Sequence, residues 1–274
     1  MNLQIIFKLL SDTHFDTALL FAFLGGVLPT IAWLFFWLKE DNKNPEPKKM
    51  IALAFAGGIL AVVVSLFFEQ AAYSINIKHL LPFEWYGHLM TWLQNYARMN
   101  GDVFEKLTLV TIFAPIIEEI CKYIFAYVLV LKSKYDDEPI DPVIYMITVA
   151  LGFAALENLL FLIDPFMKNN IIVGVMNGNM RFVGATLLHT MSSATIGMFV
   201  GFNFFDSKFK KFFWTIAGLL SAIIIHGFFN FFMVGNSSNT SFIGLQYLWV
   251  VVIIVLLLFE KIKKVKNKSI KGKI

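Results

Sequence analysis

The chain has 274 residues, of which 58% are hydrophobic and only 15% are charged. Soluble globular domains average about 45–50% apolar and about 25% charged residues, so this composition excludes a soluble domain and indicates a polytopic membrane protein. The net charge of +4 does not indicate nucleic-acid binding, because the excess of Lys and Arg is local.

Long apolar runs predict an all-α protein with about seven membrane-spanning helices. Strand-type alternation is absent, and helices pair every backbone amide internally, as lipid requires. About 20 apolar residues are enough to cross the hydrocarbon core. The predicted spans are residues 17–38, 51–68, 107–131, 143–163, 182–204, 212–234 and 242–259. We expect one transmembrane domain over residues 1–260 and a separate Lys-rich cytoplasmic tail over residues 261–274.

The distribution of Lys and Arg predicts the orientation of the chain. If the N-terminus lies outside, the cytoplasmic segments hold 16 Lys or Arg and the outer segments hold five. We therefore expect a multi-pass protein of the cell membrane with its N-terminus outside and its C-terminus in the cytoplasm. The tail after Glu260 has seven lysines, which suits a position near anionic lipid. The first span lacks a small-residue cleavage signal and is expected to be retained.

Two segments between the first three spans have contrasting compositions. Residues 39–49 are polar and contain two prolines, which predicts a plain cytoplasmic connector. Residues 69–106 form the longest segment outside the spans and place Trp85, Trp92 and Tyr96 on one helical face. This pattern predicts an amphipathic helix lying in the outer headgroup layer, with its aromatic residues at the membrane interface.

The third span carries Glu118, Glu119 and Lys122 within its apolar run. On insertion scales a charged side chain at mid-bilayer costs about 2.5–3.5 kcal/mol, so such residues usually face a polar site or a partner helix. Glu118 and Lys122 are four residues apart and are expected to pair, whereas Glu119 points about 100° away. Pro115 is expected to loosen the helix just before the glutamates and to free a carbonyl group.

The next three spans also contain polar residues that are costly in lipid. These are Glu157 and Asn158 in span 143–163, His189, Ser192 and Ser193 in span 182–204, and His226 and Asn230 in span 212–234. Gly197 and Gly201 continue the face of His189, and small residues at this spacing let helices approach closely.

The ionisable residues of four spans lie at similar predicted depths. With a rise of 1.5 Å per residue, Glu118, Glu157, His189 and His226 are roughly 9–17 Å from the outer ends of their spans. We therefore expect them to converge in one wet pocket in the outer half of the membrane. Such a cluster supports water activation by a carboxylate, hydrolysis with a bound metal, or proton or ion transport.

The single cysteine, Cys121, excludes an intramolecular disulfide framework and a multi-cysteine metal site. It is expected to be a small core residue. A peptidase that pairs this cysteine with a histidine is the alternative for this residue.

Four motifs occur in a fixed order: Glu118-Glu119-x-x-Lys122, Phe153-x-x-x-Glu157-Asn158, His189-x-x-x-Ser193-x-x-x-Gly197 and His226-x-x-x-Asn230. Together they resemble the motifs of the PrsW intramembrane proteases, which are related to the CAAX prenyl proteases and bacteriocin-processing enzymes. Asn44-Pro45-Glu46-Pro47 and Glu138-Pro139-Ile140-Asp141 also resemble PrsW sequences. The resemblance covers roughly residues 40–234 and implies a catalytic core over about 107–234.

The resemblance implies an endopeptidase that hydrolyses a peptide bond within the bilayer. It implies that Glu118 is the base that activates water and that His226 and Asn230 donate to the oxyanion. The prenyl proteases have a histidine where this chain has Glu157, so either Glu157 or His189 completes water activation.

The remaining motif residues are expected to support this site. Glu119 and Lys122 are expected to orient groups and balance charge, with Asn158 and Ser193 as further supporting residues. The implied substrate is a membrane-anchored protein, such as an anti-sigma factor that is cut on the outer side to begin a stress response.

The residues leave the cofactor open. The chain lacks an H-E-x-x-H motif, so a metal site would have to be assembled from separate helices. A divalent metal held by Glu118, His189 and His226 is the alternative to a metal-free site. The functional alternative is an ion- or proton-coupled transporter that uses the same Glu and His cluster, although the inverted repeat common in transporters is not evident.

Overall fold

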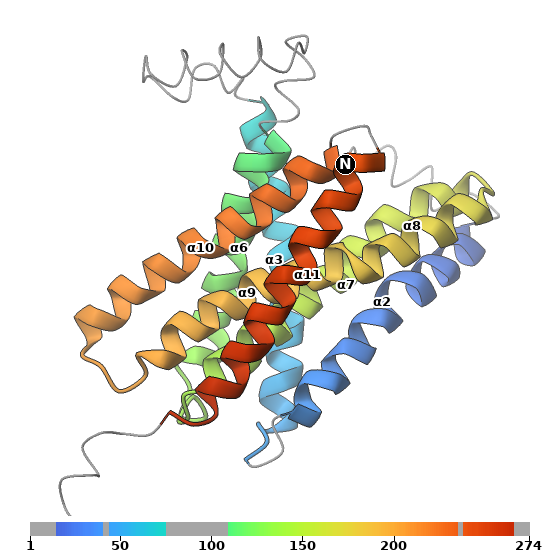
Figure 1. Cartoon of the computed structure of the whole chain (residues 1–274). Coiled ribbons are helices and arrows are strands. Elements are labelled where there is room, and N and C mark those ends of the chain that lie inside the picture. The colour runs from blue at the N-terminus through green and yellow to red at the C-terminus, as the bar shows by residue number, and fades with distance from the viewer. Residues whose placement is uncertain (1–14, 41–43, 75–108, 235–237, 266–274) are drawn as a thin grey trace, which may run out of the picture.

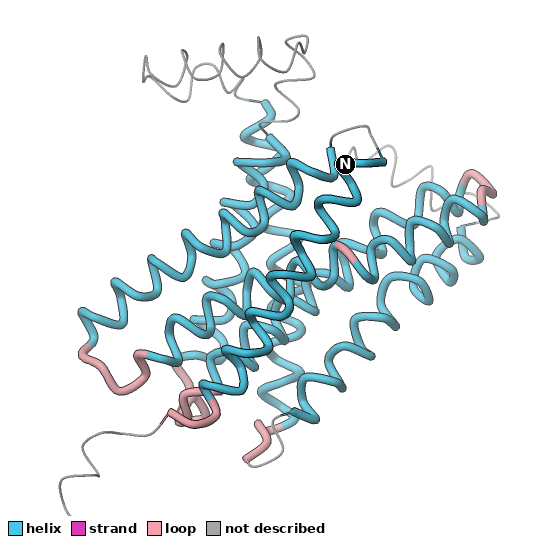
Figure 2. Tube along the Cα trace, in the orientation of Figure 1, coloured by secondary structure: helices cyan, strands magenta, loops and turns pink. Residues whose placement is uncertain are grey.

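The computed structural model describes residues 15–40, 44–74, 109–234 and 238–265 (Figure 1). The regular elements in these ranges are all helical, which confirms the predicted all-α class (Figure 2). They are α2 (Phe15–Glu40), α3 (Lys48–Ser74), η2 (Leu109–Phe113), α6 (Ala114–Ala126), η3 (Tyr127–Leu131), α7 (Asp141–Met167), α8 (Ile171–Val183), α9 (Ala185–Phe202), α10 (Lys208–Val234) and α11 (Ser238–Ile262).

Six helices in the described part of the chain are long and apolar enough to cross a membrane. These are Asp16–Glu40, Lys48–Ala72, Asp141–Met167, Ile171–Phe202, Lys208–Met233 and Asn239–Ile262, of which Ile171–Phe202 comprises both α8 and α9. Over its described residues, 109–131, the predicted third span is a continuous helical run in which the π-helical turns η2 and η3 flank α6. The fold is therefore that of a polytopic membrane protein, as the composition predicts.

Helix α8 occupies the stretch that was expected to connect the fourth and fifth spans outside the membrane. Its residues are mostly apolar, and Gly174 and Gly178 are its buried positions. A Cβ atom at Gly174 would lie 2.4 Å from the ring of Phe166, so α8 packs closely on the end of α7. The helical path breaks at Gly184, and α9 begins one residue later. The observed helix in the predicted span 182–204 therefore begins at Ala185, slightly later than predicted, and α8 precedes it.

Helix α7 lies at the centre of the bundle, next to α2, α3 and α9 (Figure 1). It crosses α3 at two glycines. A Cβ atom at Gly58 would lie 1.9 Å from the carbonyl oxygen of Val149, and one at Gly152 would lie 2.0 Å from that of Phe55. Only glycine permits this approach, which brings α3 against the helix that carries Glu157.

Helix α9 crosses the beginning of α7 in the same way. A Cβ atom at Gly197 would lie 2.6 Å from the carbonyl oxygen of Pro142, and one at Gly201 would lie 2.1 Å from that of Pro139. This contact confirms that these small residues allow a close helix approach.

The connectors that were expected to lie in the cytoplasm gather at one end of the bundle, at the bottom of Figure 1. There the side chain of Asn44 donates to Glu138, and the Tyr145 hydroxyl donates to Glu46. The carboxylate of Asp141 accepts the backbone N–H of Glu138 at 2.5 Å. The segment 39–49 is thus more than a plain connector, because it is bonded to the second stretch that resembles PrsW sequences.

Two predictions fall mainly on residues 75–108 and 266–274, which lie outside the described residues. These are the amphipathic interfacial helix and the Lys-rich tail. The single domain over residues 1–260 likewise stays a prediction.

Candidate active site

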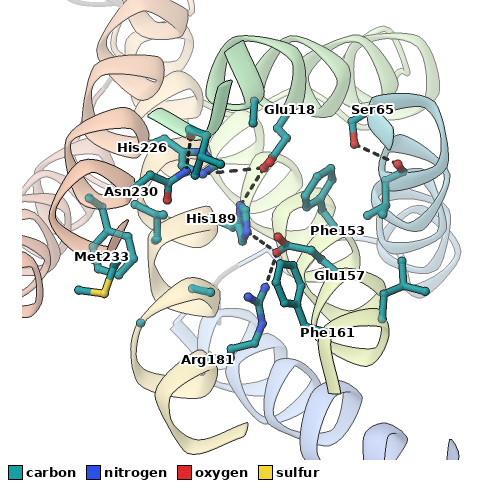
Figure 3. A pocket seen from close by; sticks show the side chains of 18 of the residues that line it. Ser65, Glu118, Phe153, Glu157, Phe161, Arg181, His189, His226, Asn230 and Met233 are labelled. Atoms are coloured by element: carbon teal, nitrogen blue, oxygen red, sulfur yellow. Dashed lines mark hydrogen bonds and ion pairs between the residues drawn. The ribbon is translucent and has the colours of Figure 1, made fainter. Parts of the chain in front are cut away.

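Among the described residues, those of seven α-helices and of the π-helical turn η2 line one cavity of about 550 Å³. Figure 3 shows this cavity from close by. Glu118 comes from α6, Glu157 from α7, His189 from α9, and His226 and Asn230 from α10. The four ionisable residues that were expected at one depth therefore meet. Helices α3, α8 and α11 and the turn η2 contribute further lining residues.

His226 is held by the buried Glu119. Its Nδ1 lies 2.9 Å from Glu119 Oε1, so Nδ1 carries the proton that is donated to the carboxylate. The second ring nitrogen, Nε2, is then an acceptor, and it lies 3.8 Å from Glu118 Oε2. The imidazole thus presents an electron pair to the cavity.

His189 has the reverse arrangement. Its Nε2 lies 2.7 Å from Glu157 Oε2 and donates to it, while Lys122 Nζ lies 3.1 Å from Nδ1 and can only donate. Nδ1 is therefore an acceptor, 3.7 Å from Glu118 Oε2. The ring packs on Phe153, with the two ring centroids 5.2 Å apart.

Glu119 is fully buried behind the cavity rather than in its wall. Besides His226, three residues donate to its carboxylate: Lys122 at 2.5 Å, Ser192 at 2.8 Å and Ser193 at 3.1 Å. The predicted pair between Glu118 and Lys122 is wrong. The ion pair joins residues three apart, because the glutamate that faces the hydroxyl groups of α9 is Glu119.

Glu118 differs from the other two carboxylates of the motifs. Its Oε2 is buried and has no hydrogen-bond partner among the described residues. Ligand atoms of Glu118, His189 and His226 all lie within 4.8 Å of one another. Three acceptor atoms thus face one point in the cavity. His189 Nδ1 accepts from Lys122 in this structure, so a cation bound at that point would take the place of this hydrogen bond.

Two ionisable residues among the described lining of the cavity were not singled out from the sequence. Arg181 of α8 forms an ion pair with Glu157, with Nη2 and Oε2 2.7 Å apart. Glu69 of α3 also lines the cavity. Both lie at the edge of a predicted span, where a charged side chain costs little free energy in the membrane. Its presence there therefore does not indicate a functional site. The sequence offers one sign that Arg181 belongs to a packed helix. It lies seven residues after Gly174 and three after Gly178, in a short apolar stretch.

The remaining predicted residues have structural contacts. Asn158 is buried, and its Nδ2 donates to Thr186 Oγ1 at 2.9 Å. Asn230 lines the cavity while one N–H of its amide donates to the carbonyl oxygen of Val110 at 3.0 Å. Cys121 packs with Ala61 and is not among the described cavity residues, so its position does not favour a cysteine peptidase.

The fold and the site define an integral membrane protein with a carboxylate and imidazole cluster inside the bundle, as an intramembrane hydrolase requires. Residues 46–258 match the PrsW family intramembrane metalloproteases. The chain belongs to this family and is an intramembrane peptidase.

Curated relatives agree with this assignment. The chain is 25% identical over 224 residues to Protease PrsW of Geobacillus kaustophilus, covering 81% of this chain and 83% of that protein. It is 22% identical over 255 residues to Protease PrsW of Clostridioides difficile, covering 90% and 92% of the two chains. The Protease PrsW of Bacillus subtilis is 23% identical over 214 residues, covering 78% and 83%. No solved structure matches this chain.

The family description implies a metal, and the residues of the cavity fit one. Zinc takes histidine nitrogens and carboxylate oxygens at about 2.0–2.2 Å, which places tetrahedral ligands about 3.3–3.6 Å apart. The two nitrogens lie 3.7 and 3.8 Å from Glu118 Oε2, close to that spacing. The other nitrogen of each imidazole is bonded to Glu157 or Glu119, as is usual for metal-binding histidines.

Proposed function

We propose that the chain hydrolyses a peptide bond of a membrane-anchored protein at the cluster of Glu118, His189 and His226. The observation that carries this proposal is the convergence of three acceptor atoms on one point of the cavity, with Glu118 Oε2 lacking a partner among the described residues. Such a cluster binds a cation or a water molecule and prepares the water for attack on a carbonyl.

Glu118, His189 and His226 would hold a divalent metal, and zinc suits this donor set. When bound, the metal would lower the pKa of a water molecule to about 7 and polarise the substrate carbonyl. Glu118 then serves as a ligand, which differs from the role of direct base that the resemblance implies.

Glu119 and Glu157 keep the two imidazoles in the tautomers whose unprotonated nitrogens lie on the same side as Glu118, toward the position of the metal. Their hydrogen bonds to His226 and His189 are 2.9 and 2.7 Å long. Because Nδ1 of His226 holds the proton, its Nε2 has none to donate, and we assign the oxyanion role to Asn230 alone. That amide has a second N–H besides the one bonded to Val110.

The proposed substrate and side of cleavage rest on the family resemblance and on the predicted orientation of the chain. The connectors rich in Lys and Arg lie at one end of the bundle (Figure 1), which supports the N-out, C-in orientation. In that orientation the predicted depths of the cluster put the site nearer the outer leaflet. The substrate is a membrane-anchored protein cut near its outer end, with an anti-sigma-like protein as the candidate class. The comparisons do not support the transporter alternative.

Cleavage of a single-span reporter by purified protein tests this proposal. Glu118→Gln should lower the rate at least about 100-fold while the protein stays folded, since the cluster loses its charged oxygen. Glu260→Gln makes the same chemical change at an exposed position near the other end of the bundle and should leave the rate unchanged.

A chelator separates the two roles of Glu118. If this residue is a metal ligand, chelation should abolish cleavage and added zinc should restore it. Full cleavage in the chelator, with none by Glu118→Gln, would leave Glu118 as a direct base. Retained cleavage by Glu118→Gln would remove the site altogether.

A further inference from the structure

Arg181 of α8 reaches the catalytic cluster through Glu157. Its Nη2 lies 2.7 Å from Glu157 Oε2, and its Nε donates to Asn158 Oδ1 at 2.6 Å. The guanidinium also lies 4.0 Å from the centre of the Phe161 ring. The guanidinium is thus held by the hydrogen bond to Asn158 and by the Phe161 ring, and it contacts Glu157 as an ion pair without a hydrogen bond from Nη2. A cation held in this way keeps its positive charge beside the Glu157 carboxylate.

The anchor of this arrangement is Asn158. Its Nδ2 donates to Thr186 Oγ1 at 2.9 Å, in the first turn of α9, while its Oδ1 accepts from Arg181. Asn158 is 1% exposed and follows Glu157 directly in α7. One buried amide therefore joins the end of α8 to the start of α9 and to the helix that carries Glu157.

Glu157 Oε2 contacts both the guanidinium and His189. The ion pair with Arg181 and the hydrogen bond from His189 Nε2 are each 2.7 Å long. A carboxylate held in this way accepts the hydrogen bond from His189 Nε2, which leaves Nδ1 without a proton. Nδ1 faces Glu118 and accepts from Lys122.

The charges around the cavity support the same role. Three carboxylates line it, from Glu69, Glu118 and Glu157. Among the described lining residues, Arg181 is the one Lys or Arg. Gly174 is also in close contact with Phe166, so the guanidinium is not the sole link between α8 and α7 among the described residues.

We propose that Arg181 is a positioning residue that holds Glu157 as the acceptor for His189, so that His189 Nδ1 is directed at the metal position. The inference depends on the proposed function, because it concerns the orientation of a metal ligand. It adds α8 to the catalytic machinery.

The affinity of the purified full-length protein for zinc, measured by competition with a chromophoric chelator, tests this inference without relying on activity. Arg181→Ala should weaken zinc binding about tenfold. Groups that hydrogen-bond a metal-binding histidine typically contribute about 10–100-fold in affinity, and Arg181 acts through such a group, Glu157. Arg181→Lys keeps the positive charge but loses the planar guanidinium. Its zinc affinity should lie between those of Arg181→Ala and the unaltered protein. Lys168→Ala removes an exposed cation from the loop before α8 and should leave affinity unchanged.

A double-mutant cycle with Glu157→Gln separates positioning from a general structural effect. If Arg181 acts through Glu157, Arg181→Ala should weaken zinc binding little further in the Glu157→Gln background. Where Arg181→Ala does not fold, Arg181→Lys is taken through the same cycle.

Three results would overturn the inference. Equal zinc affinity of the Arg181 variants and the unaltered protein would remove it and leave the proposed function intact. Additive losses in the cycle would assign Arg181 to the packing of α8 instead. Reporter cleavage by unaltered protein that binds no zinc would remove the metal from the proposed function, and this inference with it.

Discussion

Asn230 donates its side-chain amide to the backbone carbonyl of Val110, 3.0 Å away. Val110 lies in the π-helical turn η2, where each carbonyl pairs with the N–H five residues later. For Val110 that residue is Pro115, which has no N–H. The proline therefore frees a carbonyl as predicted, and a residue of the fourth motif occupies it.

Asn230→Ala should lower the free energy of unfolding by about 1 kcal/mol, the usual net value of one hydrogen bond. In a Pro115→Ala background the loss should be smaller, because the new N–H can bond to Val110. Thermal unfolding of the four purified proteins in detergent measures the coupling. Equal losses in both backgrounds would contradict the link between the two residues.

Lys122→Met should be among the most destabilising single changes. Lys122 and Glu119 are both fully buried, and their ion pair is 2.5 Å long. Removing one partner leaves a buried charge uncompensated, which typically costs about 3–5 kcal/mol. The double variant with Glu119→Gln should recover much of this loss, since no unpaired charge remains. Thermal unfolding in detergent checks both, and Lys132→Met, at an exposed position, is the control.

Gly152→Ala should separate α3 from α7. The added Cβ would lie 2.0 Å from the backbone oxygen of Phe55, an atom that cannot turn aside. Overpacking of this kind costs about 1–3 kcal/mol or more. Cleavage should also fall, because Phe153 and Glu157 follow Gly152 in α7 and would move with it. Gly178→Ala is the matched control, since its nearest neighbour would be 3.7 Å away. Similar melting temperatures for the two variants would contradict the close crossing of α3 and α7 at Gly152.

Asp136 should make stability depend on pH at the connector end of the bundle. Burial raises the pKa of its carboxyl to about 7, although the nearby Lys211 lowers it. The nearby acidic groups of Glu46 and Asp137 act in the same direction as burial. A folded-state pKa above the unfolded value of 3.8 means that the folded protein binds the extra proton. Stability from this group is therefore complete below about pH 4 and is lost as the pH rises through 7.

Asp136→Asn tests this dependence, because the amide cannot ionise. The variant should raise the melting temperature more at pH 8 than at pH 5, where the native carboxyl is already protonated. Asp137→Asn changes an exposed neighbour and should show a smaller difference between the two pH values. An equal gain at both pH values would show that Asp136 does not titrate in this range.

Much of the site was predictable because lipid makes polar residues informative. A charge or an imidazole in an apolar span is costly, so Glu118, Glu157, His189 and His226 stood out without any structure. Their similar depths predicted that they meet, and Glu118 Oε2 does lie 3.8 Å from His226 Nε2. The same reasoning could not find Arg181, because a cation near the end of a span costs little.

The sequence by itself determined that this is an all-helical membrane protein, which residues form its buried polar cluster, and which protease family its motifs resemble, since hydropathy and residue spacing are local properties. Only the tertiary structure decided that Glu119 rather than Glu118 pairs with Lys122 and that α8 brings Arg181 to Glu157. It also decided which nitrogen of each histidine faces Glu118. These pairings depend on contacts between helices, because a side chain forms its hydrogen bond or ion pair with the group that helix packing brings within reach.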